Sequence, residues 1–356
     1  MMQSTIFKIL LFPFSILYGM GISIRNFLYK TKVLRSFSFD LPIISVGNLS
    51  TGGAGKTPHI EYLIVLLKDY INVGTLSRGY KRKTSGFRVV EPQDNAELVG
   101  DEPLQYKRKY PEIQVAVGEN RVYAVPEMLK SKRDLQLILL DDAFQHRAIK
   151  PGLNILLTEY SNLYANDFIL PVGRLREWPT GAERADEIVV TKCPPTMSSA
   201  ERARIMALLN PLPHQHLYFS YYAYRAAPYY VFNSVYRTEL NETLDVLLVS
   251  GIARTDYLIE YLKTKVKSVR ILEYEDHHYF NEAEIGEIEA VFKHIDSKNK
   301  AILTTEKDAM RLELHRTYLT ENKLPVFALP VEVAFHNDDK TKFDKRIKEW
   351  LLDFRA

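Results

Sequence analysis

The fold is decided by the stretch Val46-Gly47-Asn48-Leu49-Ser50-Thr51-Gly52-Gly53-Ala54-Gly55-Lys56-Thr57. It follows the short apolar run Pro42–Val46, which predicts a strand, and precedes Pro58–Asp69, whose apolar residues have helical spacing. A glycine-rich loop between a strand and a helix is typical of a phosphate-binding loop, because backbone N–H groups and the helix N-terminus converge on phosphate oxygens. The pattern predicts that Ser50–Thr57 binds ATP.

The loop departs from the general pattern G-x-x-x-x-G-K-[ST] at its first position, where Ser50 stands in place of glycine. Gly52 and Gly53 supply flexibility inside the loop instead. In such a loop Lys56 is expected to reach the β- and γ-phosphates, and Thr57 to ligate Mg²⁺. A glycine-rich turn with a chance Gly-Lys-Thr is the alternative, and the strand–loop–helix context disfavours it.

A pair of acidic residues supplies the second half of such a site. Asp141 and Asp142 directly follow the apolar run 137–140. An acidic residue at the end of an apolar strand holds Mg²⁺ in phosphate-loop enzymes, directly or through water. The alternative is a solvated strand end, but the presence of the phosphate loop favours a metal role for both carboxylates.

The remainder of the chain alternates predicted strands and helices, which favours parallel sheets covered on both faces. We expect an α/β fold: a P-loop NTPase-type parallel sheet domain, then a β-ribbon linker rich in Tyr, Phe and Val, then a second, smaller α/β domain. The expected ranges are 1–30 for a membrane-associated helix, 31–210 for the P-loop kinase domain, 211–240 for the linker and 241–356 for the second domain, which closes a cleft.

Composition excludes several classes of protein. The 356 residues carry a net charge of +3, which is close to neutral and argues against nucleic acid as a partner. Cys193 is the one cysteine, so neither an internal disulfide nor a cysteine metal cluster can form.

The N-terminal segment Ile9–Ile24 carries no charge and is dominated by large apolar residues. It is shorter than the roughly 20 apolar residues of a spanning helix, and Pro13, Gly19 and Gly21 interrupt it. It lacks a small-residue cleavage site, which disfavours a signal peptide. A buried core helix is possible, but uniform apolarity favours a membrane anchor that spans or lies in the interface. Its basic flank would contact anionic headgroups, and consists of Lys8, Arg25, Lys30, Lys32 and Arg35.

Distributed motifs add a more specific indication. The chain resembles the tetraacyldisaccharide 4′-kinases, also called lipid A 4′-kinases, over about residues 1–310. The matching blocks are Ser45–Asn48 with Gly52–Pro58, Ser77–Tyr80, Gly100–Pro103, Asp141–His146, Leu170–Glu177, Ser250–Arg254, Asp276–Phe280 and Thr305–Asp308. The family's loop has the same residue type at Ser50. The resemblance implies a kinase that uses Mg-ATP to phosphorylate the 4′-hydroxyl of an acylated glucosamine disaccharide 1-phosphate. Because this tetraacylated acceptor is a lipid, the resemblance implies that the protein acts at the membrane surface, on the cytoplasmic face of the bacterial inner membrane.

The resemblance also assigns a catalytic pair. It implies that Asp101 takes the hydroxyl proton and is paired with His277, while Lys56 assists transfer. A carboxylate and an imidazole can orient and tune each other. The alternative for Asp101 is a helix N-cap; for His277 it is a surface histidine, and His278 beside it should point away. Because the two residues fall in different expected domains, we expect a cleft that closes on ATP.

Candidates for binding the acceptor are side chains that grip phosphate or stack on sugar rings. They are Arg78, Tyr80 and Arg121; Asn48 is a further candidate for binding the acceptor, and Arg176 and Glu177 are expected to order the site or to bind the acceptor or the nucleotide. An ordinary surface salt-bridge network is the alternative for the charged members. Glu306, Lys307 and Asp308 follow a predicted strand, and the sequence assigns them no role.

Three other functions compete with a lipid kinase. A P-loop ATPase or GTPase switch is one, but Thr191-Lys192-Cys193-Pro194 lacks the aspartate of a guanine-reading Asn-Lys-x-Asp motif. A soluble small-metabolite kinase is the second, and the apolar N-terminus disfavours it. A non-enzymatic membrane scaffold is the third, and the phosphate loop with its acidic pair disfavours that.

Overall fold

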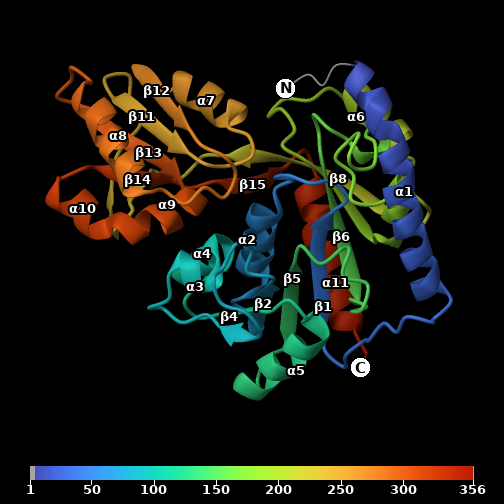
Figure 1. Cartoon of the computed structure of the whole chain (residues 1–356). Helices are drawn as coiled ribbons and strands as arrows, with labels where there is room; N and C mark the ends of the chain where they lie inside the picture. Colours follow the sequence, from blue (N-terminus) through green and yellow to red (C-terminus); the bar gives the residue numbers. More distant parts are fainter. Residues whose placement is uncertain (1–4, 356) are drawn as a thin grey trace. The chain divides into compact units, whose positions relative to one another are not determined.

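The computed structural model of the chain describes residues 5–355 (Figure 1). Residue contacts divide it into two compact units. Unit 1 comprises Met1–Arg78, Gly118–Tyr222 and Val333–Ala356, and unit 2 comprises Gly79–Val117 and Ala223–Glu332. These units differ from the ranges expected from the sequence in two places: residues 79–117 belong with the second half of the chain, and residues 333–356 belong with the first.

Unit 1 contains a sheet with the strand order β15-β8-β7-β6-β1-β5-β2. β1 lies between β5 and β6 and is parallel to both. All its residues are buried, as expected for a parallel strand covered on both faces. The elements of unit 1 are α1 (Thr5–Lys30), β1 (Ile43–Asn48), α2 (Lys56–Leu67), β2 (Val73–Ser77), α5 (Arg121–Ser131), β5 (Leu137–Asp141), β6 (Leu153–Glu159), η1 (Tyr164–Asn166), η2 (Pro179–Arg184), β7 (Glu187–Thr191), α6 (Ser199–Leu209), β8 (His216–Ala223), β15 (Glu332–Phe335) and α11 (Asp339–Asp353).

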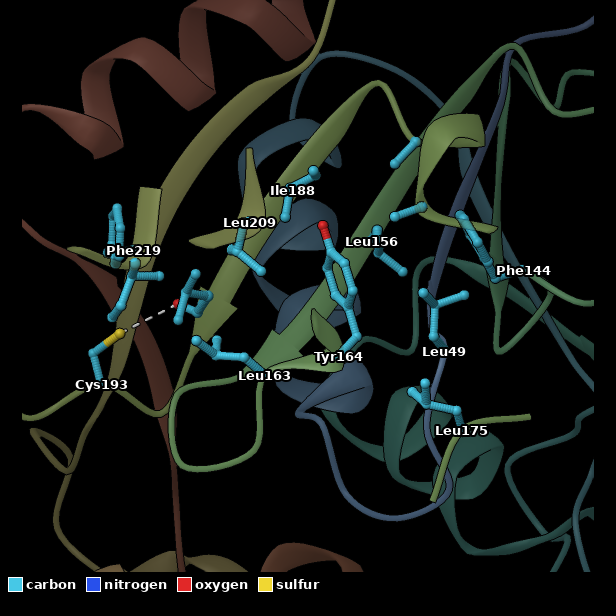
Figure 2. Packing of buried hydrophobic residues seen from close by; sticks show 14 of the residues in the cluster. Leu49, Phe144, Leu156, Leu163, Tyr164, Leu175, Ile188, Cys193, Leu209 and Phe219 are labelled. Carbon is cyan, nitrogen blue, oxygen red and sulfur yellow. Dashed lines mark hydrogen bonds between the residues drawn. The ribbon is translucent and has the colours of Figure 1, made fainter. Parts of the chain in front are cut away.

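A buried apolar cluster in unit 1 anchors the segments that build the phosphate site (Figure 2). Leu49, at the start of the phosphate loop, and Leu175, in the segment before η2, both belong to it. The single cysteine, Cys193, is buried in the same cluster and its thiol donates to the Val190 carbonyl at 3.4 Å. Burial raises the pKa of this thiol to about 12, so it is a packing residue and not a nucleophile.

Unit 2 contains a six-stranded sheet with the order β10-β9-β14-β13-β11-β12. Its central strands β11, β13 and β14 are parallel, and two apolar clusters of buried residues accompany it. The elements of unit 2 are β3 (Arg88–Val89), α3 (Ala96–Val99), α4 (Asp101–Lys109), β4 (Gln114–Val117), β9 (Tyr229–Tyr230), β10 (Asn233–Arg237), β11 (Asp245–Ser250), α7 (Asp256–Lys263), β12 (Ser268–Glu273), α8 (Glu282–Lys293), β13 (Lys300–Thr305), α9 (Glu306–Leu312), η3 (Glu313–His315), α10 (Arg316–Glu321) and β14 (Val326–Leu329).

The expected β-ribbon linker is only partly a ribbon. β9 and β10 pair antiparallel, but β8, which contains the first part of the expected ribbon, pairs parallel with β7. Its aromatic residues, Tyr218, Phe219, Tyr221 and Tyr222, are buried or half-buried and fit a sheet strand as well as a ribbon, so composition alone could not separate the two.

Helix α1 is one continuous helix of 26 residues and includes Pro13, Gly19 and Gly21. The interruptions expected from the sequence are therefore absent. At about 1.5 Å per residue, α1 is long enough, and its residues 8–30 are apolar enough, to cross a membrane. Its buried positions include Ser15 and Gly19, whereas large apolar residues face outward: Ile9, Leu10, Phe12, Phe14, Ile16, Leu17, Met20, Ile24 and Phe27. This is the reverse of the pattern of a helix that covers a soluble core.

Candidate active site

The phosphate loop has the backbone geometry that anion binding requires. Gly55 has a φ of 90°, a left-handed conformation that favours glycine, and α2 begins at the next residue. A Cβ at Gly55 would also lie 2.7 Å from the Tyr222 hydroxyl. The loop is tied to its neighbours by backbone bonds: Thr51 N–H donates to the Arg174 carbonyl at 2.7 Å, and the Thr191 hydroxyl donates to the Ala54 carbonyl at 2.8 Å.

Four side chains, Lys56, Asn48, Asp142 and Arg176, form a network beside the loop. Lys56 Nζ donates to Asn48 Oδ1 at 3.2 Å and lies 3.7 Å from Asp142 Oδ2. The Arg176 guanidinium donates to both Asp142 oxygens, at 2.9 and 3.1 Å, and to Asn48 Oδ1 at 2.7 Å. Asn48 is fully buried and also donates to the Ser50 carbonyl at 2.7 Å, so its amide is engaged within this network.

The two acidic residues differ in their surroundings. Burial opposes ionisation of Asp142, but the charges of Lys56 and Arg176 outweigh it and hold the pKa of the Asp142 carboxyl well below its usual range. Asp141 ends β5 beside Val46 of β1, and its Oδ2 accepts a hydrogen bond of 3.4 Å from Ser77. Both carboxylates thus lie next to the strand that leads into the phosphate loop.

Two of the residues expected to bind the acceptor are buried and engaged. Arg121 is 2 % exposed and donates to the carbonyls of Gly118 and Glu119, and burial lowers its pKa to about 10. Glu177 is also 2 % exposed and accepts from Gln145 at 3.0 Å and from Arg184 at 2.7 Å. Both side chains are therefore engaged with partners inside unit 1.

Arg78 and Tyr80 are exposed, in unit 1 and unit 2 respectively. The Tyr80 ring lies 4.9 Å from the His277 ring, centroid to centroid. These two side chains are accessible to a ligand, in contrast to Arg121 and Glu177.

Asp101 lies in unit 2 as the first residue of α4, where a carboxylate faces the positive end of the helix. The N-cap is Gly100, so Asp101 does not cap the helix. Its Oδ2 accepts from His277 Nδ1 at 2.9 Å and from Arg311 at 3.1 Å, and its Oδ1 accepts from the Glu102 N–H at 2.9 Å. Burial opposes ionisation, but Lys307, His277 and Arg311 outweigh it and hold the Asp101 pKa well below its usual range.

The two adjacent histidines point in different directions. His277 has a φ of 58°, and its side chain is 14 % exposed. His278 instead donates from Nε2 to Glu284 Oε2 at 2.9 Å and stacks on Tyr274. Only His277 contacts Asp101, as the sequence reasoning expected of the pair.

The expectation that Asp101 and His277 lie in different domains is wrong: both belong to unit 2. The reason is that α4 packs against α9, although about two hundred positions of sequence separate them. Ion pairs join the two helices, from Asp101 to Arg311, from Glu102 to Lys307 and from Lys109 to Glu306. The pair therefore gives no argument for a cleft that closes.

Sequence reasoning missed two residues of this cluster. Lys307 donates to Glu102 at 3.0 Å and lies 3.0 Å from His277 Nε2. Arg311, one turn further along α9, is fully buried against Asp101 and Asp308. Lys307 falls in the quoted block Thr305–Asp308, so a signal existed for it, but the sequence gave none for Arg311.

Residues 7–352 match the family model described as Tetraacyldisaccharide-1-P 4′-kinase. Curated proteins named tetraacyldisaccharide 4′-kinase are 42 % identical in Bacteroides thetaiotaomicron, covering 95 % of this chain and 91 % of that protein, and 43 % identical in Flavobacterium johnsoniae, covering 97 % of each. The one from Flavobacterium psychrophilum is 45 % identical, covering 96 % of each.

Among solved structures, a crystal structure of "apo" form LpxK from Aquifex aeolicus in complex with ATP matches with a TM-score of 0.73. The sequences are 29 % identical, and the match covers 97 % of this chain and 99 % of that one. Fold, family model and curated relatives agree along nearly the whole length. The chain belongs to the tetraacyldisaccharide-1-P 4′-kinase family.

Proposed function

We propose how this chain performs the tetraacyldisaccharide 4′-kinase reaction of lipid A biosynthesis. In this proposal ATP is the donor, and the acceptor is the 4′-hydroxyl of a tetraacylated glucosamine disaccharide 1-phosphate. The observation that carries it is the pair of sites: a glycine-rich loop with Lys56 in unit 1, and a buried carboxylate–imidazole pair in unit 2. Phosphoryl transfer needs both kinds of group, to neutralise phosphate charge and to accept a proton.

The triphosphate of ATP is held by the loop Ser50–Thr57. Its backbone N–H groups and the N-terminus of α2 favour phosphate oxygens. Lys56, which belongs to the loop and is the first residue of α2, neutralises the charge of the transferred phosphate. Asn48 and Arg176 position Lys56 and Asp142 by the network described above. The buried amide of Asn48 supports this positioning role in place of direct contact with the acceptor.

The donor set beside the loop fits Mg²⁺. Thr57 supplies a hydroxyl, and Asp141 and Asp142 supply carboxylates, and oxygen donors of this kind are the ones that Mg²⁺ prefers. Arg176 already binds both oxygens of Asp142, so Asp141 is the better first ligand and Asp142 the outer one. When bound, the ion would neutralise charge on the β- and γ-phosphates.

Asp101 accepts the proton of the acceptor hydroxyl. The hydroxyl oxygen forms a bond to the γ-phosphorus, the bond from that phosphorus to the β–γ bridging oxygen breaks, and ADP leaves. Oδ2 of Asp101 accepts bonds from His277 and Arg311, whereas Oδ1 accepts one from the Glu102 N–H and has capacity for another. Oδ1 is therefore the oxygen that takes the proton.

The enzyme binds its lipid acceptor at the membrane surface. The outward apolar face of α1 favours the acyl-chain boundary of a bilayer, and the basic residues after it favour anionic headgroups. We place the enzyme on the cytoplasmic face of the inner membrane, where ATP is available. Exposed Arg78 and Tyr80 are the candidates for the acceptor's phosphate and sugar, and Arg121, Arg176 and Glu177 order the phosphate site of unit 1.

The test is radiolabelled ATP with the purified full chain and a detergent-solubilised tetraacylated disaccharide 1-phosphate. We expect labelled lipid, and no label on a matched acceptor whose 4′-hydroxyl is replaced by hydrogen. Label on the 4′-deoxy acceptor would place transfer on another hydroxyl. Intact ATP binding with no labelled lipid would refute the proposal.

A further inference from the structure

Lys307 occupies a defined place in the cluster around Asp101. It is the second residue of α9, and its side chain is 18 % exposed. Its Nζ lies 3.0 Å from His277 Nε2 and 3.0 Å from Glu102 Oε1. The other ring nitrogen of His277, Nδ1, lies 2.9 Å from Asp101 Oδ2.

The two contacts of the imidazole together determine its tautomer. An ammonium group has three donors and no acceptor, so the nitrogen that faces it must offer a lone pair. A neutral imidazole has one N–H and one lone pair. With the lone pair on Nε2, the hydrogen is on Nδ1 and points to the Asp101 carboxylate.

The charged groups around His277 keep Lys307 protonated. Burial opposes its charge, but Glu102, Asp101 and Asp276 outweigh burial and raise the Lys307 pKa above its usual value. Asp276 Oδ2 is 4.0 Å from His277 Nε2. Three other groups face the same region: Arg311 at Asp101, Lys81 at the His277 carbonyl, and the Tyr80 ring.

We propose that Lys307 is a positioning residue that holds His277 as the neutral, Nδ1-protonated tautomer, so that the imidazole donates to Asp101 and leaves Asp101 as the sole proton acceptor. This rests on the proposed function of the Asp101–His277 pair. The ammonium acts through His277 and touches no reacting atom.

The first test reads the tautomer directly and requires no lipid. Nitrogen-15 spectra of the full chain in detergent, labelled at histidine, report which ring nitrogen carries hydrogen, and the His277 signals are assigned by their loss in His277→Gln. We expect hydrogen on Nδ1 of His277 in the wild type. In Lys307→Met we expect hydrogen on Nε2 to appear or an imidazolium to form. Hydrogen on Nε2 in the wild type, or an unchanged tautomer in Lys307→Met, would overturn the proposal.

The second test uses turnover. Lys307→Met should lower kcat by about tenfold to a hundredfold, a part of the roughly 10²–10⁴-fold that positioned acid–base groups supply. Loss of the cation raises the Asp101 pKa, so the acid limb of the pH profile should move to higher pH. Lys307→Arg should restore part of the rate, since a guanidinium is also only a donor.

A double-mutant cycle separates positioning from general damage. Because Lys307 orients the proton transfer through His277, His277→Ala with Lys307→Met should be no slower than His277→Ala alone, when both are measured at a pH above the acid limb where Asp101 is ionised. Lys109→Met is the matched control: Lys109 also joins α4 to α9, through Glu306 at 3.0 Å. It should keep kcat within about threefold. Fully additive losses, or an equal loss in Lys109→Met, would refute the positioning role.

The two proposals fail in different ways. If the wild type labels no lipid but shows the expected tautomer, the proposed function fails and the assignment of Lys307 to His277 stands. If the wild type labels lipid but His277 carries hydrogen on Nε2, only the role of Lys307 fails.

Discussion

The phosphate loop of unit 1 and the Asp101 cluster of unit 2 both surround a carboxylate of lowered pKa with cations, but with different groups. Asp142 is paired with the guanidinium of Arg176 and the ammonium of Lys56. Asp101 is paired with buried Arg311 and with an imidazole, whose hydrogen can be placed on either nitrogen. The cations around Asp142 are suited to stabilising a fixed negative charge, and the groups around Asp101 are suited to accepting a proton.

The largest effect on turnover is expected from a substitution of Asp101. Asp101→Asn keeps the size of the side chain and removes the basic oxygen, so kcat should fall by about 10²–10⁴-fold. The measurement is labelled-lipid formation at saturating ATP.

A matched control for this variant is Asp94→Asn, because Asp94 is also a buried carboxylate of unit 2 with an arginine partner, Arg88. Its loss should change stability without a comparable loss of turnover. Equal losses of turnover in Asp94→Asn and Asp101→Asn would show that any buried carboxylate of unit 2 is equally required.

On the unit 1 side, Lys56→Met should lower kcat by about 10²–10³-fold, since one preorganised donor to developing charge contributes about that much. The loss should be independent of pH, because Lys56 exchanges no proton in the reaction. Lys192→Met is the control, a lysine of unit 1 paired with Glu159 at 3.5 Å. A shift in the pH profile of Lys56→Met would contradict a purely electrostatic role.

A third prediction concerns the stability of the loop's helix. His59 of α2 bonds the Gly55 carbonyl and Ser220, and burial lowers its pKa from 6.5 to about 4. Below pH 6.5 the unfolded chain therefore binds more protons at His59 than the folded chain does. The contribution of His59 to the free energy of unfolding is fully present above pH 6.5 and is lost as the pH drops towards 4. The expected loss is about 3 kcal/mol.

The measurement is the free energy of unfolding from pH 7 to pH 4 by denaturant titration, for the wild type and His59→Gln. The variant should lack this part of the pH dependence. His294→Gln, at an exposed histidine, is the control and should retain it. If His59→Gln shows the same pH dependence of the free energy of unfolding as the wild type, His59 is not the source of that dependence.

The smallest expected effect concerns α1. Changing Phe12, Phe14 and Leu17 to serine removes apolar side chains from its outward face, and should weaken sedimentation with vesicles of phosphatidylethanolamine and phosphatidylglycerol by about tenfold or more. The control changes exposed apolar residues elsewhere in unit 1, namely Val65, Met206 and Leu352. Equal weakening by both sets would mean that α1 is not the membrane contact.

The local sequence pattern was sufficient to predict one of the two sites, the phosphate loop. The phosphate loop is contiguous, and its glycines, its lysine and the helix that follows are visible in a dozen residues. The elements beside the loop were also predicted to within two residues at each end: the strand Pro42–Val46 is β1 (Ile43–Asn48), and the helix Pro58–Asp69 is α2 (Lys56–Leu67). Ser198 caps α6 through the Glu201 N–H, which is a local signal.

The other site could not be predicted from local pattern, because it is assembled by contacts between distant segments. Arg311 and Asp101 are 210 positions apart, and Lys307 and Glu102 are 205 apart. The short helices α4 and α9, which carry these residues, have their polar side chains turned to each other, so neither shows the apolar stripe that marks a helix in sequence. The resemblance supplied the pair Asp101–His277, but the pattern of strands and helices placed its members in separate expected domains.

The central claim, that unit 1 holds the nucleotide and the Asp101 cluster takes the proton, is tested most directly by calorimetric titration of ATP into Lys56→Met and Asp101→Asn side by side. Lys56→Met should weaken ATP binding by about tenfold or more, since a charged donor to phosphate contributes about 1.5–3 kcal/mol. Asp101→Asn should leave the affinity within about threefold of the wild type, since it contacts no phosphate in this account. Equal weakening of ATP binding by the two variants would contradict the division of roles.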